Sequence, residues 1–266
     1  MKRVRLMLQN AARYPGSFLV RLLCGAAALI VAGALALIIG YILITGIPNL
    51  KPSLFALEYN SENVSLLPAL FNTVIMTLLS LLLAVPLGVG GAIYLAEYAN
   101  RSSKIVKAVR LTAETLAGIP SILYGLFGMM FFVTSLRWSY SLLAGGMTLA
   151  VMILPLILRT TEEALLSVPD SYREGSFGLG AGRLRTVTHI VLPPAMSGIL
   201  AGVILAIGRV VGETAALIYT AGTVADWPKG VMSSGRTLAV HMYVLSGEGL
   251  HVSEASATAV VLLVIV

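Results

Sequence analysis

Long stretches without any charged side chain alternate with short charged connections along this 266-residue chain. The charge-free runs cover residues 22–50, 63–96, 115–136, 138–158 and 186–208, and an apolar run ends the sequence at Ala255–Val266. A helix needs about 20 mostly apolar residues to cross a bilayer. The pattern therefore predicts an all-α, polytopic transmembrane bundle of six spans. The predicted helices lie near 18–45, 66–95, 115–136, 139–158, 196–221 and from 255 onward.

The two ends of the chain differ from an ordinary span. The apolar stretch of the first helix is near 28 residues, whereas the apolar region of a cleaved signal peptide has only about 7–15. We therefore expect a retained first helix after a cytoplasmic tail, residues 1–17. The last apolar run is only about 12 residues, roughly 18 Å of helix, which is too short to span. We expect the natural chain to continue past Val266.

Composition agrees with a membrane protein. Hydrophobic residues make up 58% and charged residues 11% of the chain. Average soluble domains are about 45–50% apolar and about 25% charged. The same figures exclude an intrinsically disordered chain, which is poor in apolar residues. The single cysteine, Cys24, excludes a disulfide framework and a cysteine-rich metal cluster.

The net charge of +6 reflects topology rather than nucleic-acid binding. Thirteen of the 18 Lys and Arg residues flank the N-terminus or lie in the second-to-third and fourth-to-fifth connections, and four lie in the alternate connections. Because cytoplasmic loops carry the excess of Lys and Arg, this distribution predicts a cytoplasmic N-terminus.

Three prolines, Pro86, Pro120 and Pro155, lie inside the second, third and fourth predicted helices. Packed membrane helices tolerate such prolines because neighbouring groups satisfy the freed carbonyls. The sequence leaves open whether they make static kinks or hinges.

The connection 159–195 is unusually long for a helical bundle, whose connections usually have about 2–8 residues. Asp170 is expected to cap a short helix over about 171–179. Gly178, Gly180 and Gly182 then end that helix, and a second short segment over 183–191 leads to the start of the fifth span at Leu192-Pro193-Pro194.

The residues of this connection resemble the cytoplasmic signature of permease subunits in bacterial ABC importers, E-A-A-x3-G-x9-I-x-L-P. The matching positions are Glu174, Gly175, Ser176, Gly180, Ile190, Leu192 and Pro193. Gly175 and Ser176 replace the two preferred alanines, and a glycine weakens a helix by about 1 kcal/mol. The flanks, Asn72-Thr73, 92–99, 116–121 and 208–214, resemble the permeases of phosphate importers. The resemblance covers roughly residues 66–245, within a permease core predicted over 66–266.

The resemblance implies that the 170–193 segment is a coupling helix docked in a groove of a separate ATPase. Its candidate residues are Tyr172, Arg173, Glu174, Gly175, Ser176, Gly180, Ile190, Leu192 and Pro193. The implied partners are a PstC-like second permease, two PstB-like ATPases and a PstS-like binding protein, in the lipid of a bacterial inner membrane, with inorganic phosphate as cargo. The alternative, a helix resting on lipid, needs a broad apolar face that the segment 170–180 does not carry.

Two charges, Arg209 and Glu213, lie inside the fifth predicted span. An arginine at the bilayer centre costs about 2.5–3.5 kcal/mol on insertion scales, so such residues face a bundle interior or a pathway. In a continuous helix the two would share a face with Gly198, Gly202, Ala206 and Ala216. They could form an i,i+4 ion pair, contact a partner subunit, or line the translocation path, where Arg209 would bind a phosphate oxygen.

Motifs for enzymatic chemistry are missing from the sequence. There is no phosphate-binding loop G-x-x-x-x-G-K-[ST], so ATP and its Mg²⁺ are assigned to the partner ATPase and no cofactor to this chain. No catalytic or metal-ligating set is predicted. Two alternatives remain: an importer of another cargo such as sulfate, molybdate or an amino acid, or an intramembrane enzyme using Arg209 and Glu213 as acid and base.

Overall fold

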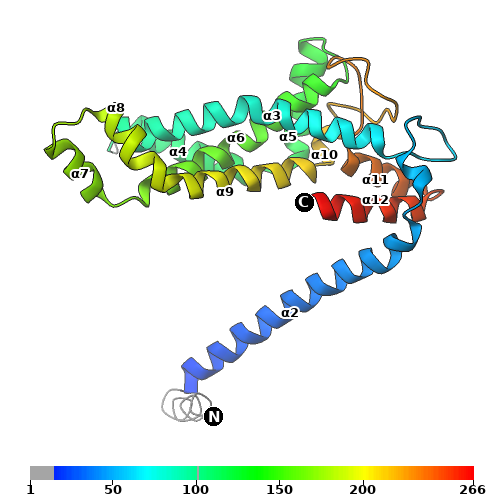
Figure 1. Cartoon of the computed structure of the whole chain (residues 1–266), viewed down its shortest axis with the longest axis horizontal. Helices are drawn as coiled ribbons and strands as arrows, with labels where there is room; N and C mark the ends of the chain where they lie inside the picture. The colour runs from blue at the N-terminus through cyan, green and yellow to red at the C-terminus, as the bar shows by residue number, and fades with distance from the viewer. Residues whose placement is uncertain (1–14, 101) are drawn as a thin grey trace.

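A computed structural model describes residues 15–100 and 102–266, and the predicted tail 1–17 lies almost wholly outside them. All regular secondary structure in the described part is helical, as predicted (Figure 1). Its α-helices are α2 (Pro15–Gly46), α3 (Leu67–Ile93), α4 (Lys104–Ala117), α5 (Ser121–Gly128), α6 (Leu142–Leu166), α7 (Asp170–Gly178), α8 (Arg183–Thr186), α9 (Leu192–Val211), α10 (Ala215–Ile218), α11 (Leu238–Glu248) and α12 (Val252–Ile265). Wider π-turns, η3 (Tyr94–Tyr98), η4 (Met129–Ser135) and η5 (Val187–Val191), follow α3, α5 and α8, and the short 3₁₀ helices η1 (Ile47–Asn49) and η2 (Pro52–Phe55) follow α2.

Helix α6 is the centre of the bundle. In its most apolar stretch 61% of the residues are buried, against 22% in the helix that contains α3, 28% in the one that contains α9 and none in α2. Helices α3, α4, α5 and α9 all contact α6. The main core cluster includes Met76, Leu149, Ile153, Ile157 and Val210. The bundle is thus built around the fourth predicted span.

The number of spans differs from the six predicted. By length and hydropathy, four helices of the described chain could cross a membrane: Gly16–Asn49, Leu67–Tyr98, Leu142–Leu166 and Arg183–Val211. A fifth is possible if α4 and the helix Ser121–Ser135 count as one bent span. Helix α12 has 14 residues and is too short, as expected for the last apolar run.

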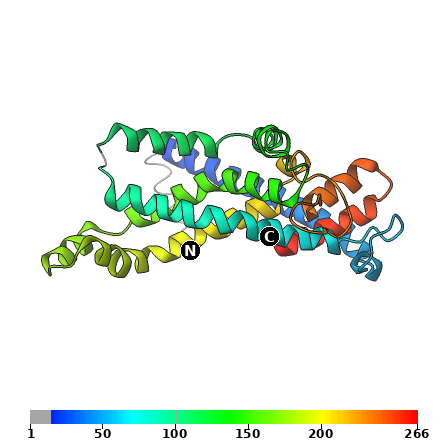
Figure 2. The same cartoon turned by 90° about the horizontal axis from the view of Figure 1, so that it is seen from above.

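The third predicted helix is interrupted, which corrects the placement of Pro120. Lys104–Ala117 and Ser121–Ser135 meet at 101°, and Pro120 precedes α5 at this bend instead of lying inside a helix. Figure 2 shows the segment after the bend end-on, beside the bundle. Proline disfavours helical geometry in the residue before it, here Ile119, which accounts for the break. Pro86 and Pro155 lie inside α3 and α6 as predicted.

Two further helix boundaries predicted from the sequence were wrong. Helix α6 continues to Leu166, so the connection expected to begin at residue 159 begins with helix. The fifth span does not start at Leu192, because α8, η5 and α9 form one helix over Arg183–Val211. The π-turn Val187–Val191 lies where Pro193 and Pro194 cannot donate to carbonyls one turn back, so the wider turn accommodates both prolines.

The far end of the bundle holds a helix that the sequence analysis missed. Helix α11 follows Thr237, whose side chain accepts the Val240 N–H, and ends at Gly249 with φ +72°. A capping threonine and a left-handed glycine were the available signals. Helix α2 leaves the bundle here and diverges from it (Figure 1). Gly46 permits this junction, since a Cβ there would overlap Ser256 and Val260 of α12.

Candidate coupling site and intramembrane charges

Helices α7 and α8 form a hairpin that protrudes from one end of the bundle (Figure 1). Helix α7 ends in a paired hydrogen-bond motif: the Ala181 N–H donates to the Ser176 carbonyl, and the Gly180 N–H to the Phe177 carbonyl. This motif places one residue in the left-handed region, and Gly180 has φ +80°. The glycine at the signature position therefore makes the sharp exit from the helix.

The expected cap at Asp170 is wrong. Asp170 is the first residue of α7, the cap position is Pro169, and no side-chain cap bond forms. The Asp170 carboxylate instead lies 3.2 Å from Nη1 of Arg173. A carboxylate in the first turn still faces the positive end of the helix dipole.

Arg173 points into the protein. Its side chain is 10% exposed, and Nη2 lies 2.6 Å from Oε1 of Glu97, whose side chain is 7% exposed. The guanidinium also donates to the carbonyls of Leu165 (2.9 Å) and Val168 (2.7 Å). The hydrogen bonds that Arg173 donates to Glu97 raise the pKa of Arg173 above its usual value. Arg173, a candidate residue of the coupling segment, therefore fastens α7 to η3, the end of the α3 helix.

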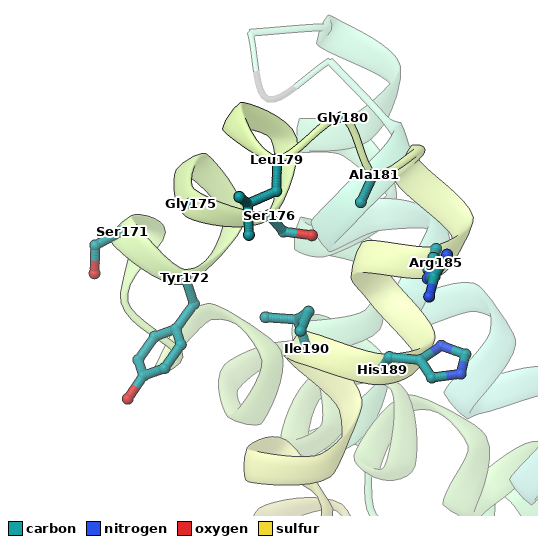
Figure 3. Close-up of a pocket in the computed structure, with 10 residues that line it drawn as sticks. All are labelled: Ser171, Tyr172, Gly175, Ser176, Leu179, Gly180, Ala181, Arg185, His189 and Ile190. Carbon is teal, nitrogen blue, oxygen red and sulfur yellow. The ribbon is translucent and has the colours of Figure 1, made fainter.

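The outer face of the hairpin is formed by other predicted residues. Tyr172 and Glu174 are exposed, as are Gly175 and Gly180. Leu179, which the sequence analysis did not single out, is 91% exposed. A groove of about 640 Å³ lies between the two arms, lined by Tyr172 and Ser176 of α7 and by Arg185, His189 and Ile190 of the α8–η5 arm (Figure 3). This groove and the exposed apolar side chains make a surface able to receive a protein partner.

The inner signature residues hold the two arms together. The hydroxyls of Ser176 and Thr186 lie 2.8 Å apart and join α7 to α8. Ile190 and Leu192 are half-buried, and Pro193 is exposed on the helix that continues into α9. Ser176 thus has a structural contact that an alanine would lack.

Further ion pairs surround the same end of the bundle. Arg110 of α4 lies 2.6 Å from Glu162 of α6, and the glutamate side chain is only 9% exposed. Arg159 pairs with Glu163 at 2.9 Å and with Glu114 at 3.3 Å on the surface. The sequence analysis counted the basic residues of the second-to-third connection, which include Arg110, and named no acidic partner for them. For the Arg173–Glu97 pair, the signal available in the sequence was the position of Glu97, which is the first charge after the apolar run 63–96.

Arg209 and Glu213 do not share one helix. Helix α9 ends at Val211, and Glu213 follows in an irregular segment before α10. The carboxylate accepts the Ala216 N–H at 3.1 Å, and none of the ion pairs of the described residues joins it to Arg209. The i,i+4 ion pair, one of the alternatives left open by the sequence, does not form because the backbone leaves the helix between the two residues. Arg209 is half-buried and Glu213 is buried.

The small residues of α9 behave as predicted. A Cβ on Gly202 would lie 2.1 Å from Oγ1 of Thr160, and one on Gly198 2.7 Å from Cβ of Ala164. Thr160 and Ala164 are in α6, so the small-residue face lets the two helices approach closely.

Comparison with known structures defines the class of the fold. The structure of a chain from a bacterial ABC transporter involved in the import of the acidic polysaccharide alginate superposes on this protein with a TM-score of 0.66. The superposition covers 98% of this chain and 95% of the transporter chain, at 18% sequence identity. This helical bundle therefore has the fold of an ABC transporter permease.

Sequence comparison then gives the family. Residues 88–266 match the binding-protein-dependent transport system inner membrane component family, and the chain belongs to it. The probable ABC transporter permease protein YqgI of Bacillus subtilis (strain 168) is 34% identical over 241 residues, covering 85% of this chain and 82% of that protein. The phosphate transport system permease protein PstA of Pasteurella multocida (strain Pm70) is 40% identical over 179 residues, 66% of this chain and 63% of that protein. The chain is thus a multi-pass inner-membrane component of a transport system and not an enzyme.

Proposed function

We propose that this chain is a permease subunit of an ATP-driven phosphate importer. It forms half of the translocation path, and the 170–193 segment couples that path to a separate ATPase. The observation that carries the coupling role is the hairpin itself. Its outer surface is exposed and grooved, while its inner surface is fastened to α3 through Arg173 and Glu97. A force applied to α7 is thereby transmitted to a helix that runs the length of the bundle.

The assignment of phosphate as cargo rests on similarity to PstA-named relatives. With that cargo, the partners are a PstC-like second permease, two PstB-like ATPases that bind ATP and Mg²⁺, and a PstS-like binding protein. The distribution of Lys and Arg supports a cytoplasmic location for the N-terminus and the hairpin.

Within the translocation path, we propose that Arg209 binds the phosphate anion. Its guanidinium has no carboxylate partner among the described ion pairs, and a planar guanidinium offers two parallel donors to a phosphate. Glu213 accepts the Ala216 N–H in the first turn of α10 and keeps a negative charge close to the end of α9 in sequence. In this role Glu213 prevents the arginine from holding the anion too tightly.

The experiment is uptake of labelled phosphate by proteoliposomes that hold the complete complex. ATP is placed on the side of the ATPases, the binding protein on the other, and sulfate is the competitor. We expect ATP-dependent phosphate uptake that sulfate does not inhibit. Arg209→Met is expected to abolish uptake without loss of assembly, and Glu174→Lys, on the exposed face of α7, to abolish coupling.

Each part of the proposal has its own contrary result. Failure of a competent wild-type complex to take up phosphate rejects the cargo and points to another oxyanion such as sulfate or molybdate. Unchanged uptake in Arg209→Met makes that arginine structural. Unchanged ATP-driven uptake in Glu174→Lys removes the coupling role of α7.

A further inference from the structure

A second buried arginine lies at the end of the bundle opposite the coupling hairpin. Arg236 precedes α11, and only 4% of its surface is exposed. Its Nε and Nη2 atoms are buried without a hydrogen-bond partner in the part of the protein described. No ion pair found among residues 15–100 and 102–266 includes it.

The contrast with Arg173 shows that burial alone does not explain this arrangement. Arg173 is equally buried at 8%, but a carboxylate and two backbone carbonyls accept its hydrogen bonds. Buried charges are normally paired in this way, because an unpaired buried charge carries a large desolvation cost. Arg236 lies instead against the ring of Tyr59, 5.1 Å from its centroid. A ring face stabilises the charge but accepts none of its in-plane hydrogen bonds.

Other buried polar atoms around Arg236 also lack partners. Asn72 of α3 is fully buried and donates to the Arg236 carbonyl at 3.2 Å, but its Oδ1 atom has no donor within the described chain. His241 of α11 is fully buried; its ring lies near the Val64 backbone, but neither ring nitrogen makes a well-aligned hydrogen bond in the same region. Its ring meets Tyr59 edge-on, with centroids 6.5 Å apart. Asn72, Arg236 and His241, together with Tyr59, are called the Arg236 cluster below.

The unpartnered atoms define what could bind. The guanidinium requires acceptors and a negative charge, Asn72 Oδ1 requires a donor, and a neutral imidazole offers one donor and one acceptor. Inorganic phosphate supplies both kinds of group, because near neutral pH it carries at least one hydroxyl as well as charged oxygens. Sulfate has no proton to donate, so it would leave Asn72 Oδ1 unsatisfied.

We propose that the Arg236 cluster is a binding site for a hydroxyl-bearing oxyanion, inorganic phosphate, at the end of the bundle opposite the ATPase-coupling hairpin. The proposal rests on the proposed function, and it adds a second phosphate contact distinct from Arg209. Tyr59, in the connection between η2 and α3, covers the guanidinium. That connection must move for an anion to reach Arg236, so the site is occluded in the state described here.

The test is the melting temperature of the purified complex with its partner subunits, without the external binding protein, in phosphate, sulfate or chloride at matched ionic strength. A ligand that binds the folded state stabilises it. We expect phosphate to raise the melting temperature by about 2–4 °C relative to sulfate. Arg236→Met is expected to lose this phosphate shift and, because it removes an unpaired buried charge, to melt no lower than wild type in chloride.

Matched variants separate the site from general effects. Lys229→Met removes an exposed cation from the connection between α10 and α11, which also holds Arg236. This variant is expected to keep the phosphate shift in melting temperature. Asn72→Leu removes the acceptor that needs a hydroxyl, so phosphate and sulfate are expected to shift the melting temperature alike. In uptake assays, Arg236→Met is expected to lower phosphate transport at least tenfold while Lys229→Met transports normally.

Three results would overturn the proposal. A wild-type complex without a phosphate-specific shift has no such site. A shift that persists in Arg236→Met but disappears in Arg209→Met places the anion at Arg209 alone. A strong loss of melting temperature in Arg236→Met in chloride makes the arginine a structural residue. Uptake by the wild-type complex separately reports the proposed function, because its absence rejects the cargo whatever the melting experiment shows.

Discussion

The guanidinium of Arg173 and the carboxylate of Glu97 join two segments 76 positions apart in the sequence. Nε and Nη2 of the arginine both reach the glutamate, at 3.1 and 2.6 Å from Oε1. The contact connects the protruding helix α7 to the end of the helix that begins as α3. This pair is one direct side-chain link between the hairpin and the bundle.

Glu97→Gln is expected to weaken that link. Because the substitution leaves Arg173 buried with a neutral partner, we expect a loss of about 1.5–3 kcal/mol in stability. Uptake of phosphate per ATP hydrolysed is expected to fall more than ATP hydrolysis itself, since the ATPases can still close. The measurement is thermal unfolding of the complex together with the ratio of transport to hydrolysis.

Asp170→Asn is the matched control for this pair. Asp170 touches the same arginine, but its side chain is 68% exposed. Exposed ion pairs contribute at most about 1 kcal/mol, so stability and coupling are expected to stay near wild type. Equal effects of the two substitutions would show that Arg173 does not transmit force through Glu97.

The sequence predicted the existence of the long helices and of the short helix α7 better than it predicted the ends of the helices. The length of an apolar stretch indicates a helix buried in lipid or protein, so α2, α3 and α6 were predicted. It does not indicate where a helix bends. The break before α5 depends on Pro120 and on packing around α6. The irregular segment before α10 has only Gly212 as a local signal, so Arg209 and Glu213 were placed on one face.

Side-chain direction at the candidate site was the least predictable feature. The signature positions of α7 were assigned together to docking, yet Arg173 faces inward while Tyr172 and Glu174 face outward. A nine-residue helix fixes which residues share a face but not which face meets the bundle. That choice depends on Glu97, which is far away in sequence and could not be paired with Arg173 by periodicity alone.

Gly180→Ala is expected to destabilise the exit from α7. The residue has φ +80°, and a Cβ there would meet no atom within 4 Å, so the cost is purely conformational. Placing an L-residue in the left-handed region costs about 1–2 kcal/mol. Hydrogen exchange of the hairpin amides measures this local loss, and faster exchange confined to α7 and the following turn is the expected result.

Gly182→Ala serves as the comparison for Gly180. Its φ is −73°, a value that any residue adopts, and it too has open space around its Cβ position. The substitution is expected to leave the hairpin unchanged or stabilise it by about 0.4–1 kcal/mol through the unfolded chain. If both alanines accelerate exchange equally, the left-handed conformation is not what the glycine supplies.

Glu213 is expected to have a structural role that can be separated from its charge. Glu213→Gln keeps an acceptor for the Ala216 N–H and should leave stability near wild type. Glu213→Leu leaves that buried donor unsatisfied, which costs about 1–3 kcal/mol. Thermal unfolding of the two variants measures the difference. Comparable losses in both would show that the negative charge itself, and not the hydrogen bond, stabilises the segment before α10.

Gly202→Ala is expected to push α9 away from α6. A Cβ at this position would overlap Oγ1 of Thr160 at 2.1 Å and Cβ of Thr160 at 2.8 Å. Overpacking of this kind typically costs about 1–3 kcal/mol. Gly208→Ala on the same helix has only Val266 in reach, at 4.0 Å, and is expected to gain up to about 1 kcal/mol from better helix propensity. The unfolding temperatures of the two variants should therefore shift in opposite directions.

A double variant tests the source of the overlap. Adding Thr160→Ala to Gly202→Ala removes the nearest overlapping atom and is expected to recover part of the lost stability. A double variant no more stable than Gly202→Ala alone would place the clash elsewhere.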